Sequence, residues 1–68
     1  MKVLDMNGNV ILKGQTVIVH QDEGEKVAMV VEPLPHCPTV NQKGHWVDID
    51  SGEGVEGMMS YILEVVLC

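Results

Sequence analysis

The chain has 68 residues, which is enough for one small domain, and we expect a single domain over 1–68. Ten acidic residues against four lysines and no arginine give a net charge of −6. This balance disfavours a nucleic acid as partner, because phosphate binding depends on clustered basic groups. No apolar run is long enough to cross a bilayer and no signal peptide is visible, so we expect a cytoplasmic protein without a membrane partner.

The N-terminal segment predicts a short hairpin. Asn7 and Gly8 form a pair that tolerates positive φ and is typical of the tight turn between two antiparallel strands. The flanking residues 2–6 and 9–12 are therefore expected to form the two strands. The alternative is that Asn7 and Gly8 only bend a lead-in segment.

Two valine-rich runs, 15–20 and 27–32, predict neighbouring strands joined by the charged linker 21–26. Alternation within the second run places Glu32 on the same face as Val30. Both runs carry apolar residues on both faces for part of their length. Either the sheet closes into a small barrel that covers each face in turn, or a second subunit covers one face. We prefer the barrel.

Residues 33–44 contain three prolines within six positions, and this pattern predicts a loop because proline removes backbone donors from helices and central strands. The next segment, 45–50, alternates between apolar and polar residues. Val47 and Ile49 are expected in the core, and the outward-facing residues are Trp46, Asp48 and Asp50.

The C-terminal third predicts four short elements. Residues 51–54 have the composition of a turn, and 55–59 indicate a weak strand. A single 3₁₀ turn over 60–62 is expected before the last strand, 63–67. That last strand could lie beside the strand at 15–20.

The order of these motifs resembles a known family. The segments are Gly14-Gln-Thr-Val-Ile-Val, Glu25-Lys-Val-Ala-Met-Val-Val, Trp46-Val-Asp-Ile-Asp and Ser60-Tyr-Ile-Leu-Glu-Val-Val. Over about 14–67 they are similar to the small SH3-like barrels of the KOW type. The resemblance implies an all-β fold, a small SH3-like barrel of five to six short antiparallel strands. Many members bind RNA or ribosomal partners, but Gly24, which matches the loop glycine of the family, stands here among acidic rather than basic residues.

Cysteine and histidine residues suggest a metal site only at first sight. His36, Cys37, His45 and Cys68 carry suitable atoms, but adjacent His36 and Cys37 cannot readily both bind one ion, and no Cys-x-x-Cys pair is present. Cys37 also lacks an electropositive setting and an orienting third residue. We therefore expect no metal, no cofactor and no enzymatic activity.

The sequence favours a small non-enzymatic binding or assembly module that recognises a protein or peptide with basic residues. An outward tryptophan beside carboxylates is a plausible anchor for such a partner. The candidate residues are Trp46, Asp48, Asp50, His36, His45 and Tyr61. Trp46 could instead pack beneath the proline-rich segment. Two alternatives remain: a nucleic-acid-associated KOW-like domain in a larger complex, and a small-ligand or catalytic site formed only in a homo-oligomer.

Overall fold

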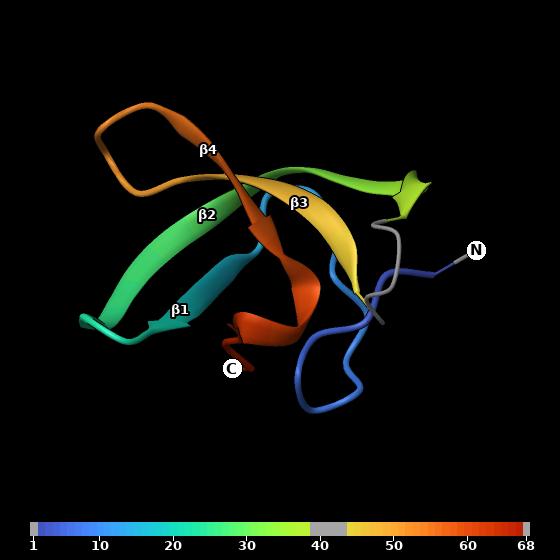
Figure 1. Ribbon diagram of the computed structural model, residues 1–68, viewed down its shortest axis with the longest axis horizontal. Coiled ribbons are helices and arrows are strands. Elements are labelled where there is room, and N and C mark those ends of the chain that lie inside the picture. The colour runs from blue at the N-terminus through green and yellow to red at the C-terminus, as the bar shows by residue number, and fades with distance from the viewer. Residues whose placement is uncertain (1, 39–43, 68) are drawn as a thin grey trace.

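The protein is an all-β domain built from one curved antiparallel sheet (Figure 1). The computed structural model describes residues 2–38 and 44–67, without the side chains of 36–38. Its elements are β1 (Thr16–Gln21), β2 (Gly24–Pro38), β3 (His45–Asp50), β4 (Val55–Met59), the 3₁₀ turn η1 (Ser60–Ile62) and β5 (Leu63–Val65). The strand order is β4-β3-β2-β1-β5. The expected fold of five to six short antiparallel strands is confirmed.

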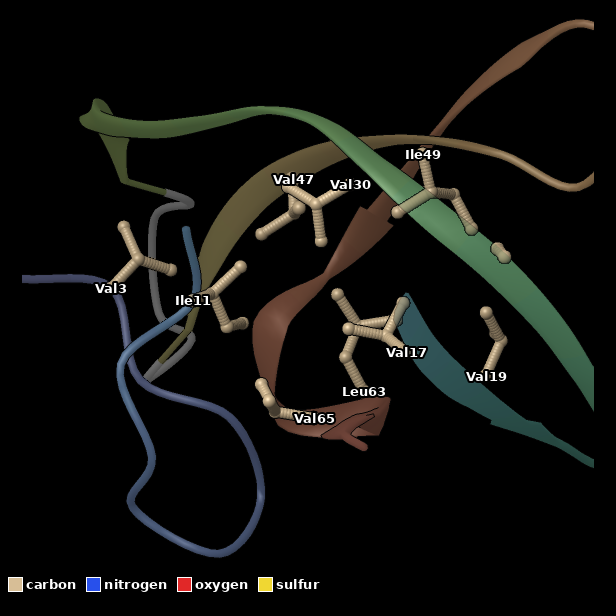
Figure 2. Close-up of a cluster of buried hydrophobic side chains, with 10 residues drawn as sticks. Val3, Ile11, Val17, Val19, Val30, Val47, Ile49, Leu63 and Val65 are labelled. Carbon is tan, nitrogen blue, oxygen red and sulfur yellow. The ribbon is translucent and has the colours of Figure 1, made fainter. Parts of the chain in front are cut away.

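β1 holds the centre of the core. Val17 and Val19 lie on the same face of the strand and are fully buried. β5 lies beside β1, with Val17 opposite Val65, so the expected pairing of the last strand is also confirmed. Figure 2 shows the buried side chains converging from both halves of the sheet and from the N-terminal segment; they belong to Val3, Ile11, Val17, Val19, Ala28, Val30, Val47, Ile49, Leu63 and Val65.

A β-bulge in β2 changes the face on which Glu32 lies. Val30 is opposite Ile49, whereas Glu32 is opposite Asp48, so Val31 is an extra residue in the ladder. The prediction that Glu32 shares a face with Val30 is therefore wrong. One inserted residue reverses the alternation, and Glu32 is exposed on the outer face of the sheet.

The proline-rich segment was predicted to be a loop, but β2 continues through its first part to Pro38. Pairing between β1 and β2 begins at Thr16 opposite Met29, so beyond Val30 the strand is bonded only to β3 among the described strands. The prolines therefore lie where one side of β2 is an edge. An edge tolerates proline, since its missing N–H removes no ladder hydrogen bond there.

The N-terminal hairpin is reduced to one bridge between Leu4 and Val10. The segment is organised instead by Asp5, which is only 6% exposed. Its carboxylate accepts hydrogen bonds from the backbone N–H groups of Asn7 (2.9 Å), Asn9 (2.7 Å) and Val65 (2.7 Å). Burial raises the pKa of Asp5, but these hydrogen bonds outweigh it, and the pKa lies below its usual value. Asp5 thus joins the N-terminal turn to β5.

The C-terminal elements follow the prediction closely. The turn at 51–54, β4 and η1 have the expected bounds, while β5 ends two residues earlier than the predicted strand at 63–67. Val66 still donates one hydrogen bond to the carbonyl of Thr16 (3.0 Å). No helix within the described ranges is long and apolar enough to cross a membrane.

Candidate interaction surface

The outer face of β3 presents an aromatic ring beside carboxylates. Trp46 is 39% exposed, whereas its neighbour Val47 is fully buried. Asp48 and Asp50 follow Trp46 at two-residue intervals and are half-buried. The predicted grouping of these three side chains on one outward face is consistent with this pattern.

Gly57 in β4 brings the ring and one carboxylate together. It pairs directly with Asp48, and a Cβ atom placed on Gly57 would lie 3.4 Å from Cε3 of Trp46 and 3.9 Å from Oδ1 of Asp48. The ring therefore lies beside the position where a side chain would otherwise stand. Because Gly57 has none, no side chain of β4 stands between the adjacent edge of the Trp46 ring and the Asp48 carboxylate at this position.

The carboxylates of this face lack a basic neighbour among the described residues. Glu32 stands directly opposite Asp48, and neither side-chain carboxylate forms a hydrogen bond or ion pair within the described part of the chain. Asp50 is bonded locally, accepting a hydrogen bond from the N–H of Gly52 (2.8 Å). We call Trp46, Gly57, Glu32, Asp48 and Asp50 the acidic–aromatic face.

The pair formed by Glu32 and Asp48 should cost stability, because like charges directly opposite on neighbouring strands repel each other. We expect Glu32→Gln to raise the free energy of unfolding by a few tenths of a kcal/mol, about 0.5 at low salt. Urea denaturation at low and high salt measures this. Glu23→Gln, in the exposed β1–β2 turn, is the control, and an equal gain there would assign the effect to net charge alone.

Fluorescence quenching tests the electrostatic setting of Trp46. A partly exposed ring beside carboxylates should be quenched by caesium more efficiently than by iodide, since the acidic groups attract the cation and repel the anion. We expect an emission maximum between those of buried and free tryptophan. Asp48→Asn should narrow the difference between the two quenchers, whereas a strongly blue-shifted and unquenched emission would contradict the exposed position.

The other predicted partner residues lie elsewhere or outside the described side chains. His45 is half-buried and lies two residues before Val47, on the same face of β3. Its backbone N–H donates to Oγ of Ser60 (3.1 Å). Tyr61 is exposed on η1, and its ring lies against Gly44, where a Cβ atom would come within 2.7 Å of Cδ2. The side chain of His36 is outside the described residues, as are those of Cys37 and Cys68. The structure thus groups only the three β3 residues of the predicted set.

Polar side-chain contacts elsewhere join neighbouring elements of the sheet. Nε2 of His20 lies 2.8 Å from Oε1 of Glu64, which joins β1 to β5, and Nδ1 lies 3.7 Å from Oε2 of Glu25. Nζ of Lys26 lies 3.2 Å from Oε1 of Glu56, which joins β2 to β4. Lys26 is therefore already engaged and supplies no cation to the acidic–aromatic face.

Apolar side chains are also exposed on the outer face. Val27 and Met29 in β2 are 64% and 54% exposed, and Val55 in β4 is exposed as well. Met29 and Val55 both pair with Asp50, so apolar groups border the acidic–aromatic face on both sides of that residue. An acidic surface with apolar borders suits a partner segment that carries both basic and apolar side chains.

Two residues of this surface were missed by the sequence-based prediction. Glu32 was assigned to the face of Val30 because alternation alone cannot reveal a bulge. Gly57 was treated only as a member of a weak strand, although a glycine inside a strand often marks a place where another group approaches closely. Within the described residues no group of three or more metal-binding side chains and no ligand-sized pocket is found.

No protein-family model matches the chain, and searches of curated proteins and of solved structures likewise gave no match.

Proposed function

We propose that this chain is a non-enzymatic binding or assembly module whose acidic–aromatic face recognises a protein segment with basic residues. The observation that carries the proposal is the exposed ring of Trp46 near the carboxylate of Asp48, which stands opposite Glu32. Neither of these two carboxylates has a described basic partner. Repulsion between paired acids costs stability, and a basic side chain from a partner would remove that cost.

Trp46 supplies the expected anchor of the interface. Tryptophan is enriched among residues that dominate binding energy, and its ring attracts cations placed against it. A lysine or arginine side chain approaching at Gly57 would therefore meet the ring and the carboxylate of Asp48 together. The net charge of −6 adds a long-range attraction for basic partners.

The finer assignment of the fold is part of the proposal. The order β4-β3-β2-β1-β5, with η1 between β4 and β5, supports an SH3-like barrel. Gly24 has a φ of 121° in the β1–β2 turn, which supports its match to the loop glycine of the KOW type. The cytoplasm remains the proposed location.

Affinity capture from an extract of the native host tests the proposal. The wild-type chain and the variants Trp46→Ala, Asp48→Asn and Leu67→Ala serve as baits. Leu67 is exposed and lies outside the acidic–aromatic face, so its variant should retain every partner. We expect the first two variants to lose the same captured protein. A partner retained equally by all four baits would contradict the proposed surface.

The two alternative functions are tested separately. A KOW-like nucleic-acid-associated domain should be retained by heparin or RNA at moderate salt, which we do not expect from this charge balance. A site formed only in an oligomer is favoured by the exposed Val27 and Met29. Light scattering decides that case, because a monomer at high concentration would exclude it.

A further inference from the structure

We infer that the partner segment binds as an added strand along residues 55–58 of β4, and that it places a basic side chain beside Gly57. This inference rests on the proposed function and specifies its geometry. The occupant is an extended segment of another protein that alternates basic residues with small or apolar ones. Such an arrangement is β-augmentation, in which backbone hydrogen bonds supply affinity and side-chain contacts supply specificity.

The first argument is that residues 55–58 of β4 form an edge of the sheet. It is the last strand in the order, and residues 55–58 form no backbone hydrogen bond in the described structure apart from their pairing with β3. Figure 1 shows the β3–β4 hairpin reaching away from the N-terminal segment. The opposite edge differs, because the N–H of Met6 donates to the carbonyl of Leu63 in β5 (3.0 Å).

The second argument is that β4 contains neither lysine nor proline. These are the residues that commonly block exposed edges. Its one charged residue, Glu56, pairs with Lys26 and lies opposite the buried Ile49. That charge is therefore already compensated and does not oppose an approaching strand.

The third argument is the position of Gly57. A residue opposite Gly57 on an added strand would project on the same face as Trp46 and Asp48. With no side chain on Gly57, the long apolar stem of an arginine or lysine on the added strand could pack against the adjacent edge of the Trp46 ring. Its charged end would then reach the ring of Trp46 and the carboxylate of Asp48, with Glu32 one strand further on.

Charge decides between a basic partner and a second copy of this chain. Pairing two β4 edges would bring two acidic–aromatic faces together, each on a chain of net charge −6. Like-charge juxtaposition opposes that arrangement, whereas a basic strand relieves the repulsion between Glu32 and Asp48. The occupant is therefore a basic segment of a different protein.

A set of short peptides tests the geometry. The probe is a capped nine-residue peptide of alternating arginine and threonine. Two further peptides carry N-methyl groups on alternate amides, one on the odd-numbered and the other on the even-numbered residues. In an added strand only one of these two sets of amides points toward β4. We expect the peptide methylated on that set to bind at least about tenfold more weakly, as two or three hydrogen bonds are lost. The other should bind like the unmodified peptide.

Two protein variants and one spectroscopic measurement complete the test. Gly57→Thr fills the space beside Trp46 with a residue that favours strands and should weaken peptide binding about tenfold at unchanged fold. Val66→Thr, an exposed position beyond β5 at the other edge of the sheet, is the control and should leave binding unchanged. In NMR hydrogen exchange, the bound probe should protect amides within 55–58.

Distinct outcomes separate this inference from the proposed function. Equal binding of both methylated peptides, or no binding of the probe while capture still depends on Trp46, would overturn strand addition and leave the interaction surface standing. A dimer of the free chain with protected β4 amides would show that a second copy is the occupant and would also overturn it. If neither peptide binding nor capture depends on Trp46, the proposed function itself fails.

Discussion

Replacing Asp5 by alanine is expected to leave the protein largely unfolded under conditions in which the wild-type chain is folded. The carboxylate accepts three backbone hydrogen bonds, and one of them comes from Val65 in β5. Hydrogen bonds to charged groups contribute about 1.5–3 kcal/mol each, and a buried N–H left without a partner adds a further cost. We expect a loss of at least about 3 kcal/mol, which is comparable to the whole stability of a domain of this size.

Circular dichroism and urea denaturation measure this loss. The stability of Asp5→Asn should lie between those of Asp5→Ala and the wild type. Its amide oxygen can still accept hydrogen bonds from Asn7 and Asn9, but its NH₂ group is a donor and cannot accept from the N–H of Val65. Asp22→Asn, in the exposed β1–β2 turn, is the control and should change stability by less than about 0.5 kcal/mol. An Asp5→Ala variant as stable as this control would show that Asp5 does not join the N-terminal turn to β5.

Acid should destabilise the protein partly through Asp5. The pKa of Asp5 is lowered in the folded state, so its ionised form favours folding. This contribution is fully present above about pH 5, beyond the unfolded pKa near 4, and is lost as the pH falls through the lower folded value. In Asp5→Asn the contribution is absent. The difference in stability between wild type and variant should therefore shrink as the pH falls below about 4.

The local patterns of the sequence predicted most of the fold because the decisive residues are close in sequence. The valine-rich run at 15–20 was placed correctly as a strand, and Val17 and Val19 on one of its faces are fully buried. The strand at 45–50 and the 3₁₀ turn at 60–62 were located correctly. Each of these elements depends on spacing within a few residues. The pairing of β5 with β1 followed from the two-sided apolar character of β1.

The errors in the prediction arise from long-range contacts. Asp5 reaches Val65, sixty residues away, and no local pattern marks that hydrogen bond. The prolines of β2 are accommodated because they lie beyond Val30, where β2 no longer pairs with β1. The extent of that pairing cannot be predicted from the local sequence of β2. For the candidate surface, the sequence identified Trp46 and Asp48 but assigned Glu32 to the wrong face. The bulge at Val31 is a property of the β2–β3 ladder as a whole.

The bulge at Val31 and the glycine at position 57 together explain how the acidic–aromatic face forms on the outer side of the sheet. Without Val31 as an extra residue, Glu32 would point toward the core. Without Gly57, a side chain on β4 would cover the edge of the Trp46 ring. Both features weaken a strand locally, and irregularities of this kind are concentrated at functional sites in proteins. This makes the outer face of β3 and β4 a better candidate than the more regular β1–β2 hairpin.

Leu63→Ala is the second change with a large expected effect. Leu63 is fully buried where η1 meets β5, and it lies opposite Val19 in β1 (Figure 2). Removing three carbon atoms from this position leaves a cavity in the core. The chain has no phenylalanine whose larger side chain could shift to fill that cavity. Replacements of this kind cost about 2–5 kcal/mol, and we expect about 3 kcal/mol by urea denaturation or as a fall in the melting temperature.

Leu67→Ala makes the same chemical change four residues later and serves as the matched control. Leu67 is 72% exposed, so its truncation should change the free energy of unfolding by less than about 0.5 kcal/mol. The difference between the two variants therefore measures burial alone. If the two losses were equal, β5 could not pack with Leu63 inward against Val19. A shift of β5 by one residue that turned Leu63 outward would also expose Val65, whose N–H donates to Asp5. The Asp5→Ala and Leu63→Ala variants therefore test the same register of β5, one through Val65 and the other through Leu63.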